Sequence, residues 1–274
     1  MKEFNVEGHE PSLLPDGNFK LVWSDEFDGT ELDRSKWDYR LSMMGKRHPA
    51  WTDKGVYLDG QGNVVFELLE ENGIPVSSQL QTGHNFMDEP VLQTTFGNDH
   101  LQWNIGKLKE NLYTHTYGYY ECRCRLMKHP EAWWAAFWMQ SPIIGASLDP
   151  AESGTELDIM EYFQVGEIAS HNAFTGGYGQ DCKNKHVGGI TGLDPDEFHR
   201  FGMLWDENGY TFYIDGVENG HISEYVSKRP EFILISTEVR GYRHKDHQPV
   251  KEAFDFIGKD NFVVDYVRVF DRMP

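Results

Sequence analysis

Residues 156–161 carry three carboxylates, Glu156, Asp158 and Glu161, interleaved with apolar residues. On a β-strand Glu156 and Asp158 would share one face, while the apolar residues between them point to the other. Glu161 lies at an odd offset from Glu156 and would face the wrong way on a regular strand. A β-bulge that adds one residue around 159–160 would return Glu161 to the acidic face, and such bulges are common beside active sites. Carboxyl groups about 5 Å apart on one face suit retaining glycoside hydrolysis.

Two other interpretations of this segment must be weighed. An amphipathic helix would gather Leu157, Met160 and Gln164 on one face and the acids on a solvated one. The Ile, Tyr and Phe residues favour a strand, and Ser153-Gly154 before it is typical of a loop. A strand with merely solvent-exposed acids is the stronger alternative, because acids usually lie on surfaces.

Length, composition and charge restrict the class of protein. The net charge of −19 over 274 residues would repel a phosphate backbone, so we expect no nucleic-acid partner. The apolar stretches are shorter than a membrane span. Cys122, Cys124 and Cys182 show neither zinc spacing nor a disulfide framework, so we expect buried structural thiols.

The pattern along the chain predicts an all-β fold in one domain. Helical periodicity is nearly absent, and turn signals such as Asp59-Gly60, 207–209 and Asp215-Gly216 separate short β-type runs. We therefore expect a two-sheet β-sandwich over residues 21–274, with residues 1–20 as an irregular arm packed on it. The predicted strands cover 21–23, 64–68, 117–127, 133–140, 156–163, 201–205, 210–214, 232–236 and 262–270.

Two further strands show alternation that bears on a groove. In 133–139 one face carries Trp134 and Trp138, and these two indoles are costly to bury completely, so we expect them to line a groove. In 233–240 the polar face carries Ser236, Glu238 and Arg240. A solvated face is the alternative for this second set.

These segments together resemble glycoside hydrolase family 16. Residues 156–161 match the bulged E-x-D-x-x-E motif of that family. The order and spacing of the other fragments agree with it: 21–27 with 32–33 and 36–37 resemble its opening strand, 117–121 and 134–139 its G-Y-[FY]-E and W-P-A-F-W-M strands, 198–216 its following hairpin, and 264–269 its closing strand.

The resemblance implies a jelly-roll β-sandwich with a concave cleft for an extended polysaccharide. It implies that Glu156 is the nucleophile and Glu161 the general acid/base, with Asp158 tuning their protonation. It further implies that Trp134, Trp138 and His171 bind substrate, and we assign Glu238 and Arg240 to the same cleft.

The same resemblance implies a structural calcium with Glu26, the Gly62 carbonyl and Asp265 as ligands, since oxygen donors suit that ion. No cofactor is expected for catalysis. We expect a monomer whose partner is the polysaccharide. The resemblance leads us to expect secretion or a periplasmic location, but residues 1–6 lack the apolar core of a signal peptide, so either a leader was removed or the protein stays inside the cell.

The predicted function is a retaining endo-β-glycosidase acting on a β-1,3- or β-1,3/1,4-glucan. An alternative is an endo-β-galactanase on an algal galactan of the agar, porphyran or carrageenan type. Residues 236–241 resemble that branch more closely, and the basic residues Arg240, Arg243, His244 and Lys245 would suit a sulfate or uronate. A lectin-like carbohydrate-binding module is the alternative from another class, but it has no use for three carboxylates in this order.

Overall fold

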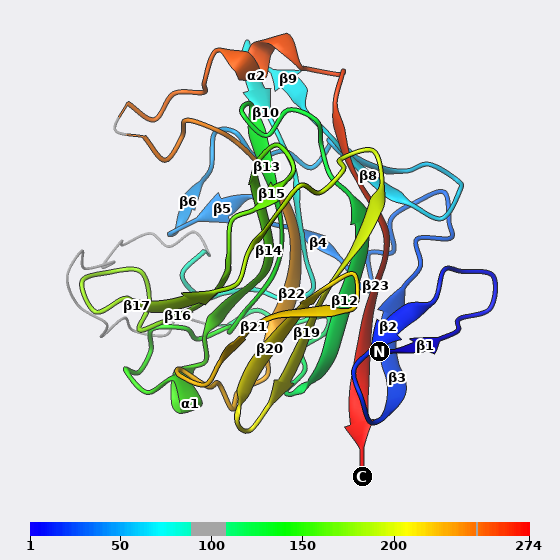
Figure 1. The fold of residues 1–274 in the computed structure, drawn as a ribbon. Helices are drawn as coiled ribbons and strands as arrows, with labels where there is room; N and C mark the ends of the chain where they lie inside the picture. Colours follow the sequence, from blue (N-terminus) through cyan, green and yellow to red (C-terminus); the bar gives the residue numbers. More distant parts are fainter. Residues whose placement is uncertain (89–107, 245) are drawn as a thin grey trace.

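The computed structural model describes residues 1–88, 108–244 and 246–274 and confirms the all-β prediction (Figure 1). Within those ranges, helix is confined to two short turns, α1 (Pro150–Ser153) and α2 (Glu252–Asp255). No helix in the described part of the chain is long and apolar enough to cross a membrane. Two large antiparallel sheets form the layers of a β-sandwich.

The first sheet has nine strands and carries the acidic segment. The segment forms β14, next to β13, and both are central in the sheet. The order across the sheet is β17 (Lys183–Val187), β16 (His171–Thr175), β14 (Glu156–Gln164), β13 (Trp133–Gln140), β22 (Phe232–Val239), β11 (Gln79–Gln81) and β4 (Asp38–Tyr39), with β15 (Glu167–Ile168) pairing β14 and β18 (Ile190–Thr191).

The second sheet has eight strands and forms the opposite layer. Its order is β21 (Val217–Ile222), β20 (Gly209–Ile214), β19 (Phe198–Asp206), β12 (Gly118–Arg125), β23 (Asn261–Met273), β8 (Val64–Glu67) and β7 (Val56–Leu58), with β3 (Asn18–Asp25) pairing β23. Three small two-stranded sheets accompany it: β1 (Lys2–Phe4) with β2 (Ser12–Leu14), β5 (Ser42–Met43) with β6 (Lys46–Arg47), and β9 (Leu69–Glu71) with β10 (Ile74–Val76).

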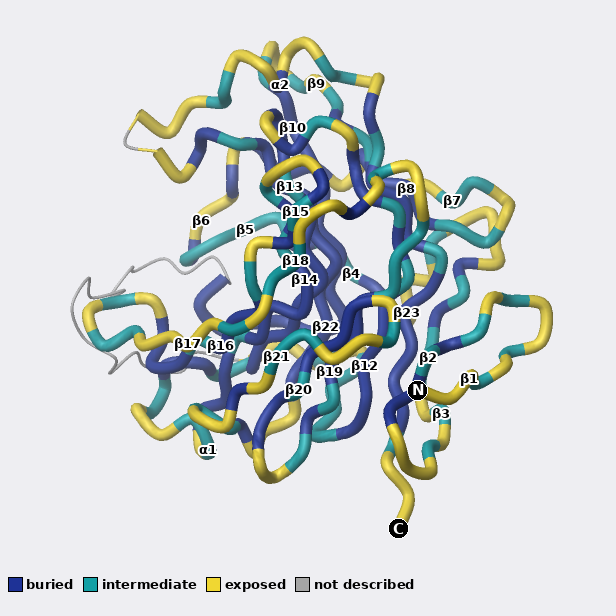
Figure 2. The backbone as a smooth tube through the Cα atoms, viewed as in Figure 1, coloured by how far each residue is buried: buried dark blue, intermediate teal, exposed yellow. Residues whose placement is uncertain are grey.

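One hydrophobic core fills the space between the sheets, and it fixes which face of β13 meets the cleft. Trp133, Phe137 and Met139 are fully buried in this core. Trp134, at the alternate position, is only half-buried and faces the other way. The buried centre and the exposed loops are evident in Figure 2. The predicted division of β13 into a core face and a groove face is confirmed.

The predicted hairpin turns are also found. Asp215 and Gly216 both have positive φ values, +48° and +77°, and they join Ile214 of β20 directly to Val217 of β21. Positive φ at both central residues is the type I′ pattern, whose twist matches that of the flanking strands.

Residues 1–20 were predicted to form an irregular arm. The structure differs, because this segment contains β1, β2 and the start of β3. The three-residue strands β1 and β2 are too short to show alternation in the sequence. Their segment is fixed to the second sheet by polar contacts: Arg268 donates from Nη1 to the Glu10 carbonyl at 2.8 Å, and the Leu13 N–H donates to Glu121 at 3.1 Å.

Candidate active site

A β-bulge in β14 turns all three acids to one face. Phe137 of β13 lies opposite Met160, but the next residue, Trp138, lies opposite Asp158. Ile159 is therefore the extra residue, as predicted for 159–160. Side chains 157, 159 and 160 are fully buried, whereas Glu156, Asp158 and Glu161 line a cleft outside the sandwich core.

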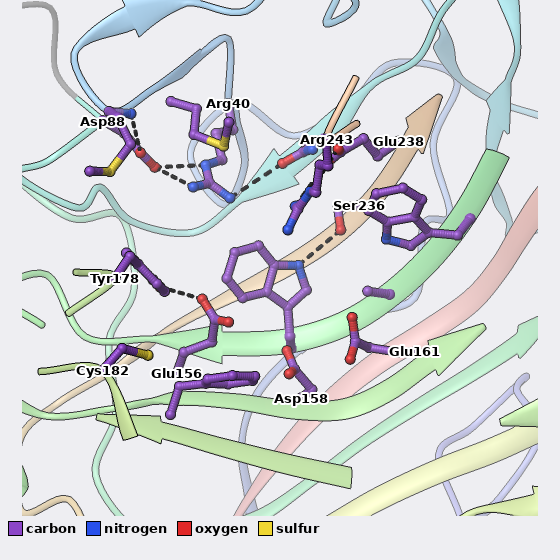
Figure 3. A pocket seen from close by; sticks show the side chains of 17 residues that line it. Arg40, Asp88, Glu156, Asp158, Glu161, Tyr178, Cys182, Ser236, Glu238 and Arg243 are labelled. Atoms are coloured by element: carbon purple, nitrogen blue, oxygen red, sulfur yellow. Dashed lines mark hydrogen bonds and ion pairs between the residues drawn. The ribbon is translucent and has the colours of Figure 1, made fainter. Parts of the chain in front are cut away.

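The cleft lies over the nine-stranded sheet and has a volume of about 410 Å³, within the range of ligand pockets. Its floor comes from β13, β14 and β22, so rigid elements hold the polar groups (Figure 3). The acidic and aromatic residues predicted for a groove all contribute to its lining: Trp134, Trp138, Glu156, Asp158, Glu161 and Glu238.

Glu156 is held by a hydroxyl and an amide. The Tyr178 hydroxyl donates to Glu156 Oε2, and Gln140 Nε2 donates to the same oxygen at 3.3 Å. Burial raises the pKa of Glu156 above its usual value, while the Tyr178 hydrogen bond lowers it. Tyr178 therefore favours the ionised form of this carboxyl group.

Glu161 is set up to hold a proton. Burial, and then the charge of Glu156, raise the pKa of Glu161 to about 7. Asn172 of β16 donates from Nδ2 to Glu161 Oε2 at 3.0 Å. Burial and the two flanking carboxylates raise the pKa of Asp158 well above its usual value. Glu156 therefore has a hydrogen bond from Tyr178 that favours its ionised form, whereas burial and neighbouring carboxylates favour the protonated forms of Glu161 and Asp158.

Two arginines cover the indole platforms. Arg243 forms a bidentate pair with Glu238, at 2.9 and 2.8 Å, and lies 5.1 Å from the Trp134 ring centroid. Arg40, from the loop after β4, pairs with Asp88 at 2.6 Å and lies 5.1 Å from the Trp138 ring. Figure 3 shows Arg40 and Arg243 on the cleft wall that faces Glu156. The cleft therefore combines carboxylates with cations.

Two residues assigned to substrate binding lie elsewhere. His171 is fully buried, with Nδ1 2.7 Å from the Ile159 carbonyl oxygen, because its strand position places it on the core face. Arg240 follows the last residue of β22, so strand alternation no longer directs it. Its guanidinium donates to the carbonyls of Pro130 and Phe163. Both assignments are corrected: neither side chain lines the cleft. Lys245 lies outside the described residues.

Several residues that line the cleft or bond its acids were missed from the sequence. Asn172 directly follows His171, and the strand register that places it opposite Asp158 was the missing information. Tyr178 and Arg40 come from loops whose positions depend on tertiary contacts. Cys182, predicted as a buried thiol, is half-buried and reaches the cleft wall.

The residues proposed for calcium do not fit that ion as they lie. The carboxylate of Glu26 is occupied by Arg268, at 2.7 Å, and that of Asp265 by Arg123, at 2.6 Å. Among the described residues no cluster of three acidic, histidine or cysteine side chains could hold a metal. Two guanidinium groups already supply positive charge where the ion would have to bind.

The sandwich, the cleft across one sheet and the three neighbouring acids on its floor are the arrangement that glycoside hydrolysis needs. The sequence pattern described as the GH16 domain of β-porphyranases A–D matches residues 20–272. The chain therefore belongs to glycoside hydrolase family 16, and the predicted family is confirmed.

Two relatives share a quarter or more of their aligned residues with this chain. Glucan endo-1,3-β-glucosidase A1 of Niallia circulans is 27% identical over 72% of this chain, but the match spans only 28% of that protein. β-Porphyranase B of Zobellia galactanivorans is 25% identical over 76% of this chain and 70% of that protein.

A solved structure agrees on the fold. The catalytic domain of an endo-1,3-β-glucanase (laminarinase) from Thermotoga petrophila has a TM-score of 0.64 and 22% identity, over 94% of this chain and 100% of that chain. It supports the predicted jelly-roll architecture.

Proposed function

We propose that this chain is a retaining endo-β-glycosidase, with Glu156 as nucleophile and Glu161 as general acid/base. The observation that carries the proposal is the bulge at Ile159, which places both acids on one cleft floor. A plain solvated face does not explain it, because Glu156, Asp158 and Glu161 are not on exposed surface.

The chemistry follows from those two environments. Ionised Glu156 attacks the anomeric carbon, while protonated Glu161 gives its proton to the departing glycosidic oxygen. A covalent glycosyl-enzyme results. Glu161, now a carboxylate, takes a proton from water as that water displaces Glu156, so the anomeric configuration is retained. An NMR time course in which the first product has the inverted anomer would contradict this proposal.

Asp158 has a supporting role in this scheme. Its hydrogen bond to Glu161 lowers the pKa of Glu161. Asp158→Asn loses the acid proton that makes this bond strong, so the pKa of Glu161 should rise and the alkaline limb of kcat/KM should move to higher pH. We expect the rate to fall by about 10²-fold, the lower end of a general acid/base contribution, without complete loss. An unchanged pH profile would exclude this role.

For the substrate we propose an algal β-galactan such as porphyran. Support comes from the match to the β-porphyranase pattern over residues 20–272, from β-porphyranase B, and from Arg243, whose exposed side chain at the cleft edge can meet a substrate anion. A β-1,3-glucan is the second candidate, favoured by the identity to glucan endo-1,3-β-glucosidase A1. Incubation with porphyran, agarose, carrageenan, laminarin and lichenan, followed by analysis of released oligosaccharides, tests both. Release from none of the five would contradict both substrates.

Arg243 provides the test of anion recognition. Its guanidinium lies at the cleft edge over Trp134, whereas Arg240 bonds backbone carbonyls outside the cleft. We expect Arg243→Ala to lower kcat/KM on a sulfated galactan by about tenfold to hundredfold, the value of a charge-assisted hydrogen bond. A neutral substrate should be affected much less.

Arg240→Gln is the matched control for that measurement and should not discriminate between the substrates. Because Arg243 also lowers the pKa of Glu156 and Glu161, each variant must be compared at its own pH optimum. Equal losses on both substrates after Arg243→Ala would show that the charge of Arg243 does not recognise a sulfate on the substrate.

A further inference from the structure

The bulge leaves one backbone position of β14 without a strand partner. On the β13 side the pairing passes from Met160 to Asp158 and omits Ile159. On the other side, pairing with β16 ends at Asp158 and pairing with β15 begins at Tyr162. Ile159 is fully buried, so water does not satisfy its carbonyl oxygen. A buried carbonyl of this kind needs a donor from elsewhere.

The His171 side chain is that donor. Its Nδ1 lies 2.7 Å from the Ile159 oxygen. Asn219 Oδ1, 3.0 Å from Nε2, can also only accept, and burial lowers the pKa of His171, so the neutral ring has a single N–H for two acceptors. The shorter contact, to Ile159, assigns that proton to Nδ1. The imidazole takes the place of the backbone N–H that a regular ladder would have supplied.

The ring itself is held from several directions. It stacks on Phe212 of the opposite sheet, with centroids 4.5 Å apart and planes 3° from parallel. Its Nε2 is 3.0 Å from Asn219 Oδ1, and Asn219 is fixed to the backbone of Gly189 by bonds of 2.7 and 3.1 Å. A Cβ at Gly188 would lie 2.9 Å from the ring. The imidazole therefore has one position available to it.

The next residue of β16 acts on the other face. Asn172 donates to Glu161 in the cleft, while His171 holds Ile159 in the core. Two consecutive residues of β16 thus form hydrogen bonds on the two faces of the bulged segment. Without the extra residue at 159, Glu161 would turn to the core side, because a shift of one residue reverses the face of every side chain.

We propose that His171 is a positioning residue for catalysis, whose Nδ1–H holds the bulge that presents Glu161 to the cleft. The proposal rests on the assignment of Glu161 as acid/base under the proposed function. It concerns a side chain that touches neither the cleft nor the substrate, so its effect on turnover passes entirely through Ile159.

Two amide substitutions separate the ring nitrogens. The amide of Asn can place a donor near the position of Nδ1, whereas that of Gln reaches toward Nε2. We expect His171→Gln to lower kcat on polysaccharide by at least about 10²-fold, as for a misplaced general acid, and His171→Asn to retain activity within about tenfold. Equal losses in the two variants, or a greater loss in His171→Asn, would overturn the proposal.

The leaving group distinguishes positioning from simple loss of stability. A displaced Glu161 matters little when the leaving group departs without a proton, so His171→Gln should recover most of its activity on a dinitrophenyl oligosaccharide. A merely destabilised protein would lose both activities in the same proportion, and that result would refute a positioning role. Thermal unfolding of both variants, monitored by circular dichroism, gives the folded fraction by which each rate is corrected.

A third measurement does not depend on activity. Nitrogen-15 NMR of the wild-type imidazole should show a protonated Nδ1 protected from solvent exchange, and an unprotonated Nδ1 would overturn the proposal. Wild-type protein that releases no product from any polysaccharide would instead contradict the proposed function. The NMR measurement would still test the hydrogen bond between His171 and Ile159, because it does not depend on activity.

Discussion

Glu156→Gln should abolish turnover while polysaccharide binding remains. The amide cannot attack the anomeric carbon, and removal of a nucleophile in other enzymes costs roughly 10⁴–10⁶-fold in rate. Because Gln has nearly the same shape and can still accept from Tyr178, the cleft should keep its form. Steady-state rates and calorimetric binding of the same oligosaccharide check the two halves of this expectation.

A matched substitution tests whether the loss belongs to the site. Glu152 lies four residues earlier on α1, is exposed and takes no part in the cleft. Glu152→Gln makes the same chemical change and should leave the rate unaltered. Wild-type turnover in Glu156→Gln would remove the nucleophile assignment, and lost binding would mean that the charge of Glu156 serves to hold substrate rather than to attack it.

The parts of the site that lie on regular strands could be predicted from sequence. Alternation in 133–140 gave the bounds of β13 and its groove face, since one face must enter a core and the other must not. The odd offset of Glu161 forced a bulge, and the bulge is where it was expected. Local periodicity is enough when the alternation within one segment, or a single break in it, decides which side chains face the core.

The parts that depend on register or on loops could not be predicted in this way. The sequence does not say that Asn172 rather than His171 lies opposite Asp158, because that depends on where β16 begins its pairing. Tyr178 reaches Glu156 from a loop in which Gly177 packs against Gly145, and a Cβ on Gly145 would come within 2.8 Å of it. Such contacts join segments with no common pattern.

The directions of the basic side chains after β22 could not be predicted from the sequence either. The basic residues after β22 were predicted as one cluster facing the substrate, yet the chain turns at Gly241, whose φ is +105°. Arg240 lies before the turn and bonds carbonyls, whereas Arg243 lies after it and pairs with Glu238. The turn thus separates one structural arginine from one cleft arginine, and the strand pattern ends too early to reveal it.

Glu161→Gln should show a defect that depends on the leaving group. The amide cannot protonate the glycosidic oxygen, so hydrolysis of polysaccharide should fall by roughly 10²–10⁴-fold. A dinitrophenyl glycoside needs no proton, and its first step should proceed nearly as in the wild type. Failure of the variant to recover on that substrate would argue that Glu161 has another role.

The same substitution has a predicted effect on stability, with a definite sign. The folded pKa of Glu161 is about 7, above the unfolded value near 4.3. Below about pH 4 both states are protonated and the group contributes nothing. Between those two values the unfolded state is increasingly ionised, so wild-type stability falls as the pH rises, by on the order of 3 kcal/mol when pH 7 is reached.

Gln cannot ionise, so Glu161→Gln should unfold at a higher temperature than the wild type at about pH 8, and the difference should vanish near pH 4. Thermal unfolding across this pH range measures it. A gain in stability together with a lost acid function would show that the buried site that keeps Glu161 protonated also lowers the stability of the fold at neutral pH. Equal unfolding temperatures at all pH values would mean that Glu161 ionises normally and is not the acid.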